Sequence, residues 1–100
     1  MSYSHPQQGK EAERLRKEAG AYLKKLREAE EITQKDLAAT IGFEYYTMVS
    51  AVESGRTRIP PDRMRAWAVA LKREPAEFGK RMLQYYDPHM WSMLFGEQKV

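Results

Sequence analysis

Residues 23–60 read LKKLREAEEITQKDLAATIGFEYYTMVSAVESGRTRIP and contain the clearest structural signals in the chain. Thr33 followed by Asp36 resembles a capping box, which predicts the start of a short helix. Gly42 is expected to end that helix, because glycine readily adopts the left-handed conformation of a tight turn. A second short helix is expected at about residues 45–54. Two such helices joined by a tight turn are typical of a helix-turn-helix.

Amphipathic helices are expected on both sides of this segment. Residues 10–31 carry apolar side chains at spacings of three and four, which predict a long first helix. Gly20 interrupts that helix, which indicates a kink or a close approach of another backbone. Later helices are expected from Pro61 to about Leu71, over residues 75–86, and from His89 to Phe95 after an Asp87-Pro88 cap. No strand pattern occurs, so the predicted fold is all-α, with five to six helices.

Composition limits the classes of function. One hundred residues, 42% of them hydrophobic, suffice for one domain and leave little material for an enclosed substrate cavity. The absence of cysteine excludes disulfides and thiolate metal sites. No apolar run is long enough for a membrane span or a secretory signal, so we expect a cytoplasmic protein with no membrane partner. The net charge of +3 favours polyanions only where the cations gather on one face.

We expect three sections along the chain. Residues 1–9 lack an apolar period and should form a flexible arm. Residues 10–80 should form the helical domain, with its central motif at about residues 33–54. Residues 81–100 should form an extra C-terminal aromatic helical segment.

The central segment resembles the phage Cro and cI repressor-like helix-turn-helix domains, also called the XRE family. The resemblance covers roughly Gly20 to Leu71, and implies a repressor-like domain whose first motif helix crosses the DNA backbone and whose second lies in the major groove. One residue more than usual separates Gly42 from Gly55, so either the turn or the start of the next helix is longer. The resemblance rests on Gly20, Leu23, Leu26, Arg27, residues 33–38, Ile41, Gly42, Val49, Ser50, Val52, Glu53, Gly55 and Leu71.

The outward side of the helix at residues 45–54 supplies the residues expected at base edges. At about 100° per residue, with Val49 toward the core, Val52 and Tyr45 also face inward. The base-edge candidates are Tyr46, Thr47, Ser50, Ala51 and Ser54. None is a cation or an amide that reads guanine or adenine through paired hydrogen bonds. Selectivity would then use methyl groups, hydroxyls, DNA shape, or Arg56 and Arg58 reaching into the groove. The alternative is that the base-edge candidates are only small solvated residues.

The phosphate candidates lie at the start of the first motif helix and after the second. Free backbone N–H groups and the Gln34 amide can hold a phosphate at a helix start, and the resembling family uses the matching Gln in this way. The resemblance also implies that Arg27 and Glu53 form a partly buried ion pair, which belongs to the scaffold. The phosphate candidates are Thr33, Gln34, Lys35, Arg56, Thr57 and Arg58.

The sequence contains no set of residues that indicates catalysis. His5 and His89 do not complete a metal site, which normally needs three or four ligands. No activated nucleophile, general base or phosphate-cradling glycine loop was found. We therefore expect no enzyme activity, metal, cofactor or small-molecule ligand.

The segment MLQYYDPHMWSMLFG, at residues 82–96, is too apolar for a solvated tail. We expect the last short helix to bring Met90, Trp91, Met93, Leu94 and Phe95 inward. In one interpretation the segment folds onto the long first helix and enlarges the monomer core. In the other it forms a two-fold dimer interface, with Tyr85, Tyr86, Met90, Trp91, Leu94 and Phe95 as candidates.

Together these features predict a nucleoid-associated, sequence-specific transcriptional regulator that binds double-stranded DNA. A repressor that binds an inverted repeat as a homodimer is the expected form. The alternative is a protein-interaction module on the same scaffold, such as an antitoxin-like partner binder.

Overall fold

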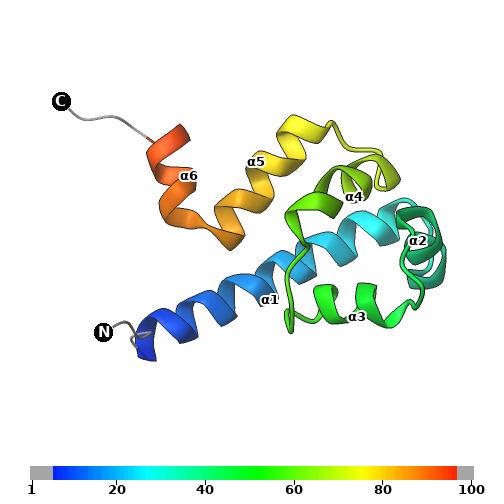
Figure 1. Cartoon of the computed structure of the whole chain (residues 1–100), viewed down its shortest axis with the longest axis horizontal. Helices are drawn as coiled ribbons and strands as arrows, with labels where there is room; N and C mark the ends of the chain where they lie inside the picture. Colours follow the sequence, from blue (N-terminus) through cyan, green and yellow to red (C-terminus); the bar gives the residue numbers. More distant parts are fainter. Residues whose placement is uncertain (1–5, 97–100) are drawn as a thin grey trace.

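The computed structural model describes the backbone of residues 6–96 and the side chains of residues 9–96 (Figure 1). Every regular element in that range is helical, which confirms the predicted all-α class. Residues 1–5 of the predicted arm and residues 97–100 lie outside the described residues. The elements are α1 (Pro6–Ala29), α2 (Gln34–Ile41), α3 (Thr47–Glu53), the 3-10 helix η1 (Pro61–Arg63), α4 (Met64–Ala70), α5 (Pro75–Tyr86) and α6 (Pro88–Phe95).

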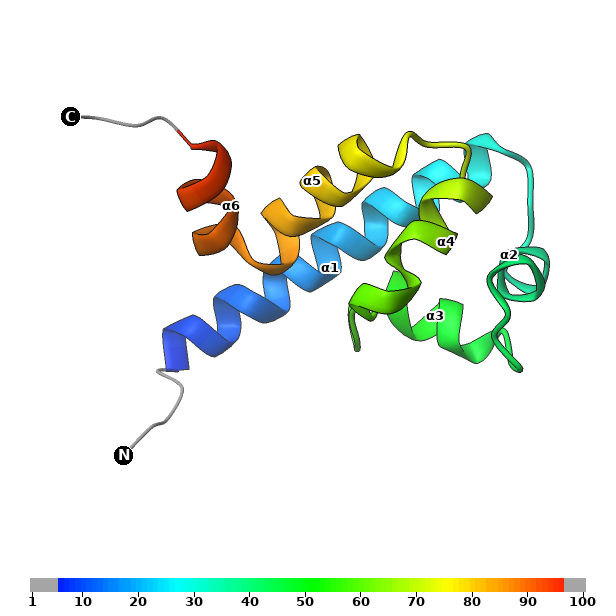
Figure 2. The same ribbon diagram turned by 45° about the horizontal axis from the view of Figure 1, so that its top comes forward.

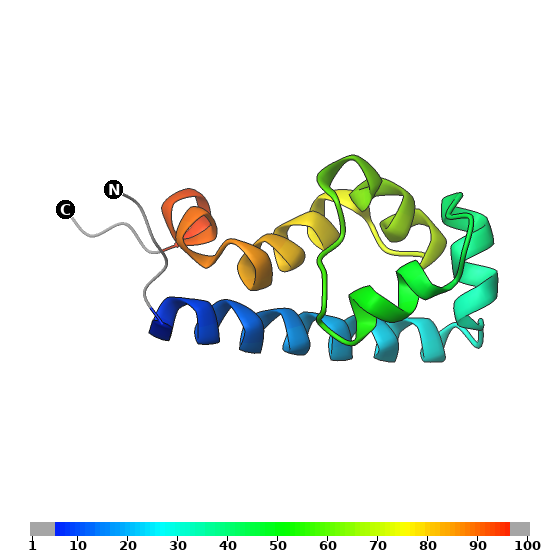
Figure 3. The same ribbon diagram turned by 60° about the horizontal axis from the view of Figure 1, so that its bottom comes forward.

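The long helix α1 supports the other elements. It begins at Pro6, so residues 6–9 belong to this helix and not to the predicted arm. α3 and α5 both pack against it. Figure 3 shows α1 along one edge of the molecule, with α6 toward its N-terminal end and α2 across its C-terminal end. Its buried side is centred on Ala19, Leu23 and Leu26, whereas Ala12 is exposed. The N-terminal part of α1 therefore extends past the core.

Both ends of α2 form as the sequence predicts. The backbone N–H of Asp36 donates to Thr33 Oγ1 at 3.0 Å, and the backbone N–H of Thr33 donates to Asp36 Oδ2 at 3.1 Å. These hydrogen bonds to Thr33 hold the pKa of Asp36 below its ordinary value. At the other end, Gly42 adopts a left-handed conformation with φ 90°, and its N–H donates to the carbonyl of Ala38. The capping box and the glycine stop are confirmed.

The core lies where α1 to α5 meet. Trp67, Ala68 and Leu71 are buried, as the periodicity of the fourth helix predicts, while Met64 is half-buried. Phe78 is the largest buried side chain of α5. The remaining buried apolar residues are Ala19, Leu23, Leu26, Leu37, Ala38, Ile41, Val49, Val52, Ile59 and Met82.

Backbone contact joins α1 to α3 at Gly20. A Cβ atom at this position would lie 2.1 Å from the carbonyl oxygen of Glu53, closer than any side-chain atom can approach. Glycine is therefore required for the observed distance between the two helices. Of the two interpretations of Gly20, close approach and kink, the structure supports the close approach.

The last helix, α6, does not turn its apolar side into the core. It packs on α5 at one end of the molecule, while α2 and α3 lie toward the other end (Figure 2). None of its residues is buried, and Leu94 is 59% exposed. The expected inward orientation is therefore wrong for Met90, Met93, Leu94 and Phe95, which are exposed, while Trp91 is half-buried. The sequence periodicity is correct for a helix, but it does not specify how α6 is placed on α5.

Asp87 precedes α6, as expected, without capping it through the side chain. Its carboxylate instead accepts hydrogen bonds from Arg58, with Nη2 2.6 Å from Oδ2 and Nη1 3.4 Å from Oδ1. The Arg58 guanidinium also lies 4.6 Å from the ring centroid of Tyr86. The corner between α5 and α6 is thereby attached to the loop that follows α3.

Candidate nucleic-acid interface

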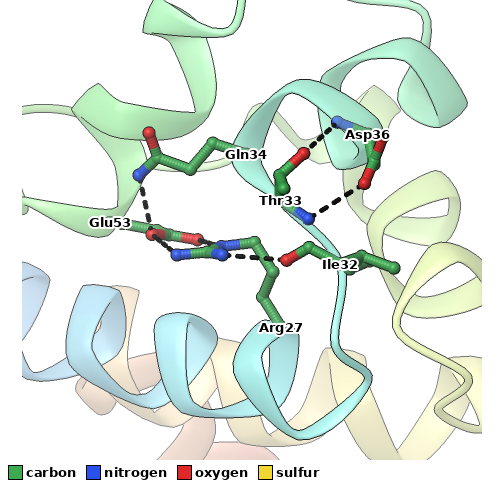
Figure 4. A network of polar contacts seen from close by, with 6 residues as sticks. All are labelled: Arg27, Ile32, Thr33, Gln34, Asp36 and Glu53. Carbon is green, nitrogen blue, oxygen red and sulfur yellow. Dashed lines mark hydrogen bonds and ion pairs between the residues drawn. The ribbon is translucent and has the colours of Figure 1, made fainter.

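One polar network joins α1, α2 and α3 on the inner side of α3 (Figure 4). Arg27 of α1 donates to both carboxylate oxygens of Glu53 on α3, from Nε at 2.7 Å and from Nη2 at 3.1 Å. Gln34 of α2 donates to the same carboxylate from Nε2 at 3.0 Å. Arg27 Nη1 also donates to the carbonyl of Ile32 at 2.9 Å. Planar, bidentate contacts of this kind fix orientation, so the network sets the angle of α3 against α1 and α2.

The network belongs to the scaffold and not to the exposed surface. The Arg27 side chain is 10% exposed and the Glu53 side chain 3%. The hydrogen bonds to Glu53 raise the pKa of Arg27 above its ordinary value. The ion pair that the resemblance implied is therefore confirmed. Its burial makes each partner dependent on the other, since a lone buried charge is strongly destabilising.

The outward side of α3 presents most of the residues expected at base edges. Thr47 and Ser54 are exposed, Ser50 and Ala51 are half-buried, and the two valines of α3 are buried behind them. Ser54 Oγ donates to the carbonyl of Ala51 at 3.1 Å and accepts from Arg56 Nε at 3.2 Å. The Ser54 hydroxyl is thus already used inside the protein, while Thr47 and Ser50 make no such contact among the described residues.

The turn before α3 is longer than expected. Five residues, Gly42 to Tyr46, separate α2 from α3, where three or four are usual. The additional residue lies in the turn, and α3 begins at Thr47. Tyr45 is consequently 64% exposed, and its predicted inward orientation is wrong because a helical wheel does not apply outside the helix. Tyr46 lies toward α2, where Lys35 Nζ is 5.7 Å from its ring centroid.

The start of α2 lies beside α3, as Figure 4 shows. The backbone N–H of Thr33 is engaged in the capping box, whereas the Thr33 hydroxyl only accepts there and keeps its O–H as a donor for a ligand. Gln34 points to Glu53 with one of its two amide N–H groups. The backbone N–H groups of Gln34 and Lys35 lie in the first turn, which has no intrahelical acceptors. Lys35 is exposed and is the cation of this edge.

The loop after α3 divides into an outward part and an inward part. Arg56 and Thr57 are exposed. Arg58 is instead bound to Asp87 and is 40% exposed. Next to it, the backbone N–H of Ile59 donates to the hydroxyl of Tyr86 at 3.2 Å, and burial raises the pKa of that hydroxyl. Sequence reasoning grouped Arg58 with the outward cations and missed the Arg58–Asp87 pair, which spans 29 residues of chain without a local signal.

The residues suggested for a dimer interface fall into two groups. Tyr85 and Tyr86 pack against the monomer core, and the Tyr85 ring lies 5.8 Å from that of Tyr22. The second group lies on α6 and is partly or largely exposed: Met90, Trp91, Leu94 and Phe95. Only this second group leaves apolar surface for another molecule.

The described residues hold no group of three or more His, Asp or Glu side chains arranged to bind a metal ion. His89 is exposed at the start of α6, and His5 lies outside the described range. Among residues 6–96 there is also no helix long and apolar enough to cross a membrane.

Comparison with known proteins agrees with this geometry. A family model described as helix-turn-helix matches residues 23–78, which is more than half of the chain. The match includes all of α2, α3 and α4 and ends inside α5. No curated protein and no solved structure matches the chain.

Proposed function

This chain belongs to the Cro/cI-like XRE family of helix-turn-helix DNA-binding regulators, and we propose that it is a repressor that occupies inverted repeats in double-stranded DNA as a homodimer. The observation that carries the proposal is the framing of α3. At one end of its outward side Lys35 lies over the Tyr46 ring, and at the other end Arg56 is hydrogen-bonded to Ser54. Glu53 anchors the helix from behind. This arrangement supports α3 in the major groove and the start of α2 on the backbone.

The base-edge contacts in this proposal come from the outward side of α3. Thr47 and Ser50 offer hydroxyls and Ala51 a methyl group, and Tyr46 reaches the flank of the site. Ser54 acts mainly through Arg56, whose side chain it holds. No paired hydrogen bond to one base is available from these residues, so we expect modest discrimination at each position.

The phosphate contacts come from fewer cations than the sequence suggested. Lys35 and Arg56 are exposed and unpaired with acids among the described residues, whereas Arg58 is held by Asp87. The N–H groups at the start of α2, the Gln34 amide and the Thr57 hydroxyl add neutral donors. Two neutralised phosphates per subunit give a slope of about −2 for log affinity against log salt. An unchanged affinity across salt concentrations would contradict this assignment.

We assign DNA binding to residues 10–80 and dimerisation to α6. α5 is continuous through residue 80, so this division is one of roles and does not mark a break in the structure. Met90 and Leu94 lie one turn apart on α6, at 48% and 59% exposure. In the proposed dimer these side chains pair across a two-fold axis, and binding of an inverted repeat requires the two α3 helices to lie about 34 Å apart, one turn of DNA. Occupying a promoter blocks polymerase without any further contact, which favours repression and a nucleoid location.

Selection of bound sequences from random duplexes tests the proposal. We expect enrichment of a motif with two half-sites whose centres are about one helical turn apart. Ala51→Glu, which places a negative charge at the groove, should abolish enrichment. Val69→Glu is the matched control, since Val69 is an exposed apolar residue of α4 away from this surface. No enrichment of any duplex at low ionic strength would overturn the proposal.

The exposed α6 also favours a second candidate, binding of a different protein through the same helix. Leu94→Glu distinguishes the two. Loss of the dimer in sedimentation together with weaker DNA binding supports the homodimer. If the unmodified chain is already a monomer that binds single half-sites, α6 is left for another protein partner.

A further inference from the structure

The side of α3 proposed to enter the groove has an unusual composition for a DNA reader. Residues 43–54 contain no Arg, Lys, Asn or Gln, the side chains that hold guanine or adenine through paired hydrogen bonds. Two acidic residues occur there. Glu44 lies in the turn before α3, and Glu53 is buried against Arg27. Composition therefore excludes bidentate readout of purines from α3.

Methyl groups dominate what remains on this side. Thr47 and Ala51 lie one helical turn apart on the outward side, and Met48, 44% exposed, lies beside Ala51 on the helix. We call Thr47, Met48 and Ala51 the methyl stripe. Cβ atoms four residues apart on a helix are separated by about 5–6 Å. That distance spans between one and two base-pair steps of about 3.4 Å.

The groups at the two ends of the methyl stripe hold it against DNA without reading a base. Lys35 lies over the Tyr46 ring at the N-terminal end of α3, and Arg56 is bonded to Ser54 at the C-terminal end. Both are cations on the same surface as the stripe, and both suit phosphates. The surface is thus a small apolar strip between two positive charges, complementary to a groove lined with methyl groups between two phosphate backbones.

Building on the DNA-binding function proposed above, we infer that α3 recognises the C5-methyl groups of pyrimidines in the major groove, so that thymine and 5-methylcytosine are read alike. Thymine presents this methyl group in the major groove and cytosine does not. Methylation of cytosine at C5 places the same group at the same position. The hydroxyls of Thr47 and Ser50 can hydrogen-bond to either base pair, so they do not disfavour replacement of thymine by 5-methylcytosine.

The expected effect follows from the area of one methyl group. Removing one such group from a buried contact lowers affinity about fourfold, which corresponds to about 0.8 kcal/mol. A symmetric change in both half-sites lowers it about 16-fold, because the two contacts are independent. These factors are measurable by fluorescence anisotropy.

The test uses the full-length protein and the duplex that it selects from a random pool. Each thymine of the site is replaced in turn by deoxyuridine, which removes the methyl group and leaves the hydrogen-bonding edge intact. We expect a loss of about fourfold at one or two positions of each half-site and no change elsewhere. At those positions an unmethylated cytosine–guanine pair should also bind weakly, and 5-methylcytosine should recover most of the affinity.

Two variants assign the effect to the methyl stripe. Thr47→Ser removes a methyl group and keeps the hydroxyl, so the penalty for uracil should disappear at one position and remain at the other. Ser50→Ala is the matched control, because it changes the neighbouring hydroxyl and should leave both penalties in place. Far-UV circular dichroism and thermal unfolding verify that both variants are folded.

The outcomes separate this inference from the proposed function. Selection of a motif without thymine in its half-sites, or equal affinity for thymine and uracil at every position, overturns methyl recognition while DNA binding stands. Uracil penalties that are the same in Thr47→Ser as in the unmodified chain at every position overturn the role of Thr47. Failure to bind any duplex at low ionic strength overturns both proposals.

Discussion

Replacement of Glu53 with leucine removes the carboxylate that receives three hydrogen bonds behind α3, two from Arg27 and one from Gln34. The Arg27 guanidinium then remains in a site where its side chain is 10% exposed, with only the carbonyl of Ile32 as a partner. Arg27→Met produces the opposite defect, a carboxylate at 3% exposure that keeps only the Gln34 amide. Each single substitution thus leaves a charge with little solvent and no counter-charge.

Breaking a buried ion pair on one side costs about 3–5 kcal/mol of unfolding free energy. Small domains have about 5–15 kcal/mol in total, so either variant should retain only a fraction of its stability. The double variant, Arg27→Met with Glu53→Leu, leaves no buried charge and places two apolar side chains together. We therefore expect it to be more stable than either single variant and close to the unmodified chain.

Urea unfolding followed by far-UV circular dichroism at low temperature measures all four proteins. Arg14→Met is the matched control on the same helix, because Arg14 pairs with Glu11 and Glu18 on the exposed side of α1. Its urea midpoint should change little. The reasoning is refuted if the single variants lose less than about 1 kcal/mol, or if the loss in the double variant equals the sum of the two single losses.

Three further predictions concern other contacts. Gly20→Ala should lower the thermal midpoint, because the alanine Cβ would lie 2.1 Å from the Glu53 carbonyl oxygen. This clash costs about 1–3 kcal/mol of unfolding free energy, which outweighs the gain of about 1 kcal/mol in helix propensity. Burial raises the pKa of Tyr86, so the folded chain holds the hydroxyl proton more tightly than the unfolded chain. The stability that this difference contributes is complete below the ordinary tyrosine pKa of about 10 and is lost as pH rises through the pKa of the folded state. Urea midpoints from pH 8 upward should therefore fall less in Tyr86→Phe than in the unmodified chain. Asp87→Asn frees Arg58 for phosphate, and should steepen the salt dependence of DNA binding by about 0.9 per subunit in an anisotropy titration.

Most helices could be predicted because their signals are local. The Thr33–Asp36 capping box and the Gly42 stop act through hydrogen bonds between residues three or four apart, and such bonds can be read directly from the sequence. The burial of Trp67 follows from a spacing that holds within one helix. The Arg27–Glu53 pair joins distant residues, and it was predicted only through the family resemblance.

The structure differs from the sequence predictions where one element meets another. Tyr45 was placed inward because its distance from Val49 was counted along a helix, yet the longer turn ends that count at Thr47. The apolar side of α6 is expected in the core from its sequence. The structure instead packs α6 mainly on α5, and no local sequence pattern specifies that placement. Arg58 has the composition of a phosphate ligand, and its carboxylate partner is 29 residues away.

The Arg58–Asp87 pair joins the two surfaces that the proposed function needs. α6 has no buried residue, so its direction depends on its contacts with α5 and on the corner that Asp87 forms. Arg58 holds that corner from the loop just after α3, and α1 packs against both α3 and α5. In the proposed dimer, the distance between the two α3 helices is therefore set through this corner. Each methyl contact changes the affinity only about fourfold. The binding free energies of the two half-sites add fully only when the distance between the two α3 helices matches one turn of DNA. The orientation of α6 should thus matter as much for affinity as the residues that touch the bases.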